Sequence, residues 1–261
     1  MIKVNVRDFI EEHYLHFNAG TLATCIRSLE EFLHNGGKLV VTLAGAMSTA
    51  EIGRTLAPAI RAGLVHGISC TGANLEEELF NLVARDDYED VDWRNLSAND
   101  ELELQKKGMN RVTDTCIPEV EAVRIVEKIL LNKWLDAEKS GNCKPPHEYL
   151  IEVIKSGEVE FQANPDDCWL IAANDMEIPI FTPGWADSTL GNIFSARLID
   201  GVIANDRIIT TDLQRMHDLA LWYRKQKCPV GLLQVGGGIA GDFPICVVPM
   251  LRQDLGDNVE L

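Results

Sequence analysis

Three loops of small residues are the part of this sequence best suited to chemistry, because each lies between an apolar run and a helical segment. The loops are Ala44-Gly45-Ala46-Met47, Thr71-Gly72-Ala73 and Gly236-Gly237-Gly238. A bare turn at the start of a helix leaves backbone N–H groups unpaired at the positive helix end, and such groups bind phosphate. If the apolar runs are parallel strands of one sheet, the loops share an edge and could hold a dinucleotide.

The third loop carries the most specific pattern. Residues 236–241 match G-x-G-x-x-G between a predicted strand and a predicted helix, which is the context that dinucleotide binding requires. The pattern lies near the end of the chain, whereas the usual fingerprint belongs to the first strand–helix unit. A tight turn that needs positive φ is the competing interpretation.

Two carboxylates follow the second loop directly. Glu76 and Glu77 could accept hydrogen bonds from the ribose hydroxyls of a dinucleotide. The alternative is local: Glu77 would complete a helix cap, and Glu76 would interact with the positive end of its own helix. The sequence leaves both interpretations open.

Further polar candidates follow the last two predicted strands. Asp187 and Asn192 come after a predicted strand at 178–182, where open α/β sheets bind ligands. Asp187 could instead cap the next helix. Asp242 precedes Phe243-Pro244, a pattern that also fits a plain N-cap with proline in the first turn.

The elements that must position these residues alternate along the chain. Predicted strands cover residues 39–43, 67–70, 110–116, 178–182 and 230–235. Predicted helices cover residues 21–35, 48–61, 74–84, 118–138, 146–156, 168–174 and 209–226, with capping patterns at Ser48 and Asn74. The acidic residues 85–110 are predicted to form an exposed insertion with local helix. The alternation predicts an α/β fold, a mainly parallel sheet with helices on both faces.

The composition and net charge of the chain restrict the kinds of partner that the protein could bind. The 261 residues can form one large domain, and the net charge of −16 argues against nucleic acid or an anionic membrane as partner. The same charge is compatible with a cationic substrate or with an ordinary acidic surface. Seven cysteines without a C-x-x-C pair indicate a reducing compartment and no metal site. The first residues lack a signal-peptide pattern and no apolar stretch could span a membrane, so we expect a cytoplasmic protein.

Taken in chain order, the loops and their neighbours resemble the deoxyhypusine synthase family. The resemblance covers about residues 20–250 and includes Leu43–Ser48, Thr71–Glu78, Asn110-Arg111, Ile178–Pro183, Asp187–Gly191 and Gly236–Gly238. In detail the chain looks more like the bacterial deoxyhypusine-synthase-like branch, some of whose members form homospermidine. The resemblance implies a Rossmann-like fold, bound NAD and a homotetramer.

The resemblance also implies a reaction and a set of site residues. The aminobutyl group of spermidine passes to an amine acceptor, which is a protein lysine in deoxyhypusine synthases and putrescine in the homospermidine-forming relatives. The implied NAD contacts are Gly45, Ala46, Met47, Thr71, Gly72, Ala73, Glu76, Glu77, Asp187, Gly236, Gly237 and Gly238. The implied polyamine contacts are Asn192 and Asp242.

Three departures from the family pattern affect the chemistry. Asn192 stands where the family carries an aspartate for the polyamine. Asp242 stands where the family carries a histidine, so it is the one catalytic candidate within the chain and the proton-transfer step is altered. The family's nucleophilic lysine, in a Trp-Gly-Lys motif beyond the glycine triplet, has no counterpart here. We therefore expect residues 1–261 to be one NAD-binding domain that lacks the segment with the catalytic lysine.

Two other functions compete with the aminobutyl transferase. If the chain ends at residue 261, it would be a non-catalytic protein that binds NAD or a polyamine. A sirtuin-like deacylase has a related fold, but the chain lacks the paired C-x-x-C motifs of the usual zinc module.

Overall fold

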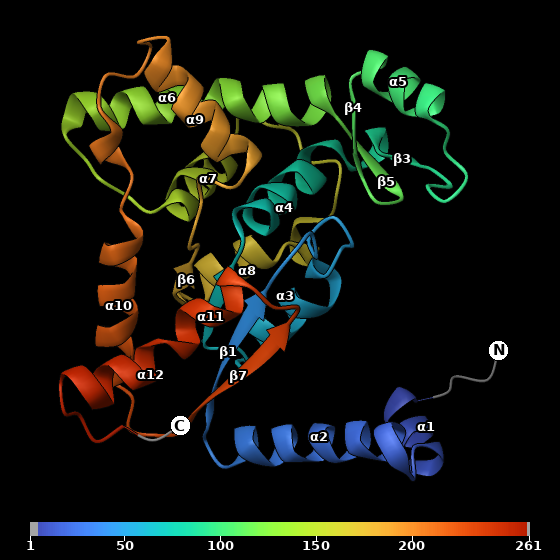
Figure 1. Cartoon of the computed structure of the whole chain (residues 1–261), viewed down its shortest axis with the longest axis vertical. Coiled ribbons are helices and arrows are strands. Elements are labelled where there is room, and N and C mark those ends of the chain that lie inside the picture. The colour runs from blue at the N-terminus through green and yellow to red at the C-terminus, as the bar shows by residue number, and fades with distance from the viewer. Residues whose placement is uncertain (1–4, 260–261) are drawn as a thin grey trace.

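Four parallel strands form the centre of the molecule (Figure 1). The computed structural model describes residues 5–259; the ends of the predicted domain, 1–4 and 260–261, lie outside the described residues. The strands β1 (Lys38–Leu43), β2 (Gly67–Cys70), β6 (Ile180–Phe181) and β7 (Val230–Val235) lie in the order β6-β2-β1-β7. Every neighbouring pair is parallel, which confirms the predicted sheet.

Helices cover both faces of this sheet, as the side chains of β1 show. Leu39, Val41 and Leu43 belong to a large buried cluster that includes residues of α3, α4, α8 and α9. Val40, which points to the opposite face, packs in a second cluster with residues of α10, α11 and α12. β1 is buried along all but its first residue, as expected of a parallel strand that is covered on both sides.

The helices follow the predicted order. They are α1 (Val6–His13), α2 (Phe17–His34), α3 (Gly53–Arg61), α4 (Gly72–Ala84), α5 (Ala98–Lys106), α6 (Ile125–Ser140), α7 (Pro146–Lys155), α8 (Trp169–Asp175), α9 (Thr189–Ile199), α10 (Asp212–Arg224), α11 (Ile239–Ile245) and α12 (Val247–Pro249). A π-helical turn at 119–124 leads into α6, and α1 and α2 extend away from the body in Figure 1. Within residues 5–259, none of these helices is both long and apolar enough to cross a bilayer.

A small antiparallel sheet replaces the single strand predicted at 110–116. β4 (Met109–Val112) and β5 (Thr115–Pro118) pair with each other, and β3 (Glu89–Asp90) pairs with β5. The chain reverses at Thr113, whose φ is 58°. Asp114 follows it, and aspartate favours turns because its side chain bonds nearby backbone. The prediction was wrong because the reversal carries no glycine or proline.

Two predicted helix starts were also wrong. Residues 44–52 form turns, and α3 begins only at Gly53 with Ile52 at its N-cap position, so Ser48 caps no helix. α4 begins at Gly72, and Thr71 is its cap, since Thr71 Oγ1 accepts a hydrogen bond from the Asn74 N–H. Both side chains are used elsewhere: Ser48 Oγ accepts from Trp169 Nε1 at 3.0 Å, and Asn74 Oδ1 accepts from the Ser48 N–H across the loops.

Candidate functional site

The loops after the four strands gather at the carboxyl edge of the sheet, because the strands are parallel. From β1 the chain proceeds outward to β2 and β6, and then returns to place β7 on the other side of β1. Such a reversal of strand order opens a crevice at the carboxyl edge, where α/β sheets bind ligands. The loops after β1 and β7 flank this crevice. The late position of the glycine run is thereby explained, since the last strand is the neighbour of the first.

The glycines of the third loop differ in their surroundings. Gly236 has φ of 84°, and a Cβ there would lie 2.9 Å from the Ala44 Cβ, so this position needs glycine for the turn and for the approach of the two loops. A Cβ on Gly237 or Gly238 would meet no atom within 4 Å, and the same holds for Gly45 in the first loop. The tight-turn interpretation applies to Gly236 and also to Gly238 and Gly45, whose φ values are 71° and 62°. Gly237, Gly238 and Gly45 in addition present bare backbone to open space.

Asn74 holds the first and second loops together. Its Oδ1 accepts a hydrogen bond from the Ser48 N–H at 2.9 Å, and its Nδ2 donates to the carbonyl oxygens of Leu43 at 3.1 Å and Gly45 at 2.8 Å. Thr71 Oγ1 also donates to the Gly45 oxygen, at 3.0 Å. The side chain of Asn74 is fully buried, so these bonds fix the loop geometry before any ligand arrives. Sequence reasoning assigned Asn74 a capping role and missed this one.

Glu76 and Glu77 are both buried at the start of α4, but their carboxylates are used differently. The two oxygens of Glu76 accept hydrogen bonds from the N–H groups of Thr189 at 2.8 Å and Leu190 at 2.7 Å. Burial raises the pKa of Glu76, and these two N–H groups oppose that rise. Glu76 thus caps α9, a different helix from the one to which it belongs.

The carboxylate of Glu77 remains available. Its Oε2 is buried and has no hydrogen-bond partner within the described part of the chain. Burial raises the pKa of Glu77 to about 7, and hydrogen bonding with Thr49 opposes that rise. A cation or hydroxyl group of a ligand would satisfy it, because an unpaired buried acceptor is costly.

A cavity of about 660 Å³ lies between α4 and α9, and we call it the α4–α9 cavity. It brings together five of the predicted site residues, which are Ala73, Glu76, Glu77, Asp187 and Asn192. Asp242 is absent from its lining and is exposed in the first turn of α11. The N-cap position of that helix is Gly238, so the capping alternative for Asp242 was wrong.

The segment after β6 shapes one wall of this cavity. Ser188, and not Asp187, caps α9, since Ser188 Oγ accepts from the Gly191 N–H at 3.1 Å. Asp187 is therefore exposed and lines the cavity. Asn192 Nδ2 donates to the carbonyl oxygens of Ala186 at 3.0 Å and Ser188 at 2.7 Å. The amide nitrogen is thus used by the backbone, and the Asn192 Oδ1 remains as an acceptor for a ligand.

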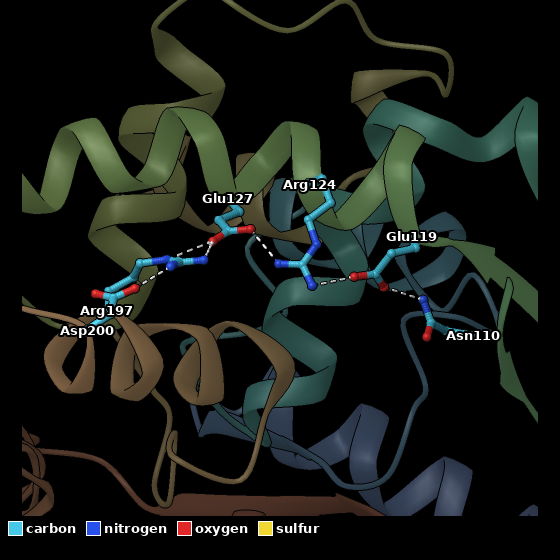
Figure 2. Close-up of polar contacts among 6 residues, drawn as sticks. All are labelled: Asn110, Glu119, Arg124, Glu127, Arg197 and Asp200. Carbon is cyan, nitrogen blue, oxygen red and sulfur yellow. Dashed lines mark hydrogen bonds and ion pairs between the residues drawn. The ribbon is translucent and has the colours of Figure 1, made fainter. Parts of the chain in front are cut away.

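Two arginines on the cavity wall, Arg124 and Arg197, were missed by sequence reasoning. Figure 2 shows that they belong to a polar chain made of Asn110, Glu119, Arg124, Glu127, Arg197 and Asp200. Glu127, which is 8% exposed, joins them: it accepts from Arg124 Nη1 at 2.5 Å and from Arg197 Nη2 at 2.9 Å. Burial alone would raise the pKa of Glu127, but the two guanidinium groups lower it below its ordinary value. The polar chain fixes α9 against the start of α6.

Comparison with known proteins gives a consistent result. The family model described as deoxyhypusine synthase matches residues 10–259. A relative from Nostoc punctiforme, named deoxyhypusine synthase-like protein, is 26% identical over 97% of this chain and 64% of its own length. A relative from Archaeoglobus fulgidus, named as a deoxyhypusine synthase, is 27% identical over 88% of this chain and 68% of its own length.

A solved structure supports the fold. The crystal structure of an Entamoeba histolytica protein, described as a deoxyhypusine synthase, matches with a TM-score of 0.58 and 14% identity, covering 90% of this chain and 77% of that one. At this identity the likeness concerns the fold alone. The chain spans 64% of the length of the Nostoc relative, so it corresponds to part of that protein.

Proposed function

The chain belongs to the deoxyhypusine synthase family, and from this premise we propose that it binds NAD and takes part in the transfer of the aminobutyl group of spermidine to an amine acceptor. The observation that carries the proposal is the convergence of the small-residue loops at the reversal of strand order, beside a cavity lined by Glu77, whose buried Oε2 has no hydrogen-bond partner among residues 5–259. The first feature suits a dinucleotide and the second suits an amine.

The residues at the carboxyl edge fit NAD. Bare backbone at Gly45, Gly237 and Gly238 leaves room for close approach of a pyrophosphate. Gly72 and Ala73, in the first turn of the 13-residue helix α4, add N–H groups and a positive helix end. The complete set that we propose to contact NAD consists of Gly45, Ala46, Met47, Thr71, Gly72, Ala73, Glu76, Glu77, Asp187, Gly236, Gly237 and Gly238.

The proposed reaction needs no net oxidant. Bound NAD would supply a reversible hydride acceptor, taking a hydride from the spermidine carbon beside the secondary amine and returning it to the product imine. The aminobutyl group would pass from spermidine to the acceptor amine, and 1,3-diaminopropane would leave. The acceptor that we favour is a small amine such as putrescine, which would give homospermidine.

The residues of the α4–α9 cavity would bind and orient the polyamine. Glu77 would become fully ionised beside an ammonium group, because an adjacent positive charge lowers a carboxyl pKa that burial has raised. Asp187 would add a second charge, and the Asn192 Oδ1 would accept a hydrogen bond from an amine without contributing charge. Asp242 would reach the substrate only if the ligand extended beyond this cavity.

The covalent step needs a nucleophilic amine. No lysine of residues 5–259 lines the α4–α9 cavity, so the residues of this cavity do not supply that amine. The same observation favours the second candidate function, a protein that binds NAD or a polyamine without catalysis. We also propose that the protein is cytoplasmic and forms a homotetramer. Light scattering on the purified protein would test the oligomeric state.

One experiment separates these functions. The protein, expressed as its gene encodes it, is incubated with NAD, spermidine and putrescine, and mass spectrometry follows 1,3-diaminopropane and homospermidine. Binding of NAD and of spermidine is measured in parallel by calorimetry. Product formation supports the transferase, and NAD binding without any aminobutyl product supports the binding protein. Failure to bind NAD would contradict the transferase, and failure to bind both NAD and spermidine would contradict the binding protein as well.

A further inference from the structure

The opposite face of α4 lines a second cavity, of about 410 Å³, which we call the α3–α4 cavity. Its wall comes from the start of α3, from α4 and from the loop before α8, and its polar residues include Glu51, Arg54, Glu78, Asn81, Arg85 and Asp167. It shares no residue with the α4–α9 cavity. None of the residues proposed for NAD or the polyamine lines it.

Two buried acceptor atoms on this wall have no hydrogen-bond partner among residues 5–259. Glu78 is only 3% exposed; its Oε1 accepts from the Trp169 N–H at 2.7 Å, but its Oε2 has no hydrogen bond within residues 5–259. Asn81, three positions further along α4, has a buried Oδ1 that is likewise unpartnered there. Residues three apart on a helix are surface neighbours, and Glu78 and Asn81 line the same cavity. Both accept hydrogen bonds, and what they lack is a donor.

The charges around the cavity indicate the charge of the ligand that would supply this donor. Both arginines are committed to one carboxylate: Arg54 Nη1 lies 3.0 Å from Glu51 Oε2, and Arg85 Nε pairs with Glu51 Oε1. Glu51 has φ of 55°, an uncommon conformation for this residue type, which the surrounding contacts must hold. Of the other carboxylates on the wall, those of Glu78 and Asp167 form no ion pair among the described residues. The cavity therefore carries an excess of negative charge.

A metal ion does not fit this site. Within residues 5–259 there is no group of three or more His, Cys, Asp or Glu side chains placed to hold one. The remaining lining includes Leu82 and Ala163, which suit the methylene groups of an organic ligand.

We propose that the α3–α4 cavity binds a small aliphatic amine in its ammonium form, whose N–H groups donate to Glu78 Oε2 and Asn81 Oδ1. The alkyl chain would lie against Leu82 and Ala163. Burial raises the pKa of Glu78 to about 7, and an ammonium group beside it favours the ionised carboxylate. This site does not rest on the proposed transferase function, because it uses the other face of α4.

The test compares two cations of equal charge. The protein is titrated calorimetrically with n-butylammonium chloride and, separately, with tetramethylammonium chloride at the same ionic strength. Tetramethylammonium carries the charge but no N–H donor. We expect saturable binding of butylammonium alone, and equal binding of both cations would overturn the proposal.

Variants locate the site. Glu78→Gln and Asn81→Leu should each weaken butylammonium binding about tenfold, the usual effect of losing one hydrogen bond to a charged group. Asn81→Leu serves if Glu78→Gln fails to fold, which circular dichroism would reveal. Glu152→Gln, a glutamate that lines neither the α3–α4 nor the α4–α9 cavity, is the control and should leave butylammonium binding unchanged. Loss in Glu77→Gln with retention in Asn81→Leu would assign the amine to the α4–α9 cavity and refute the proposed site.

Discussion

Gly237→Ala separates the proposed ligand contact from the fold. A Cβ at this position meets no atom within 4 Å, and the backbone there does not have a positive φ. The substitution should therefore cost no stability, and it should raise the free energy of unfolding by about 0.4–1 kcal/mol because the unfolded chain loses freedom. The methyl group nevertheless enters the space where we propose that the NAD pyrophosphate approaches the loop.

The expected effect of Gly237→Ala on NAD binding is larger than its effect on stability, and it is unfavourable. Forcing one extra carbon into a filled contact costs about 1–3 kcal/mol, which is about 5- to 150-fold in the NAD dissociation constant. The contrasting variant is Gly236→Ala, where φ is 84° and the new Cβ would lie 2.9 Å from the Ala44 Cβ. That variant should lose stability by about 1–2 kcal/mol as well as NAD affinity.

The assay has two readouts on each variant, urea unfolding followed by circular dichroism and NAD titration by calorimetry. The reasoning is refuted if Gly237→Ala binds NAD as tightly as the parent protein. It is equally refuted if Gly237→Ala is destabilised as much as Gly236→Ala, because the two positions would then share a structural role.

Three other substitutions test the cavity. Glu127→Gln should lower the free energy of unfolding at pH 7 by about 1–3 kcal/mol, because the carboxylate accepts from Arg124 and Arg197. Folding lowers the pKa of Glu127, so this carboxylate stabilises the folded protein above the unfolded pKa of about 4.3, and the stabilisation is lost as the pH falls through the folded pKa. Urea titrations at pH 3–7 should show this loss in the parent protein and not in the variant. Burial raises the pKa of Glu77 to about 7, so ionisation of this group destabilises the folded protein as the pH rises from about 4.5 to 7. Glu77→Gln should remove that decline and raise the free energy of unfolding by up to about 3 kcal/mol at pH 8. An unchanged dependence of stability on pH would contradict the burial argument. Asn192→Asp should tighten spermidine binding severalfold in calorimetry by adding a charge beside the ammonium groups, and weaker binding would argue that the amine does not reach this residue.

Much of the fold could be predicted because its signals are local. The apolar runs that became β1, β2 and β7 and the periodic helix α10 lie where the sequence placed them. The hairpin of β4 and β5 could not be predicted, because a reversal at Thr113 without glycine or proline resembles a continuous strand.

Prediction of the candidate site was limited in the same way. The loops and the pair Glu76 and Glu77 were evident from residue type and spacing. The sequence did not show which of the two glutamates keeps an unpaired oxygen, because Glu76 accepts hydrogen bonds from the start of α9, more than a hundred residues away. Arg124 and Arg197 each look like half of a local ion pair in the sequence, and only their shared contact with Glu127 shows that they line one cavity.

By itself, the sequence determined where backbone is bare and where carboxylates are concentrated, since glycine freedom and helix periodicity act within a few residues. The tertiary structure decided which of these features meet. The order β6-β2-β1-β7 brings the last glycine loop beside the first, and the cross-loop bonds of Asn74 fix their geometry. It also divided three consecutive glutamates between two cavities, because side chains at successive positions of a helix point in different directions.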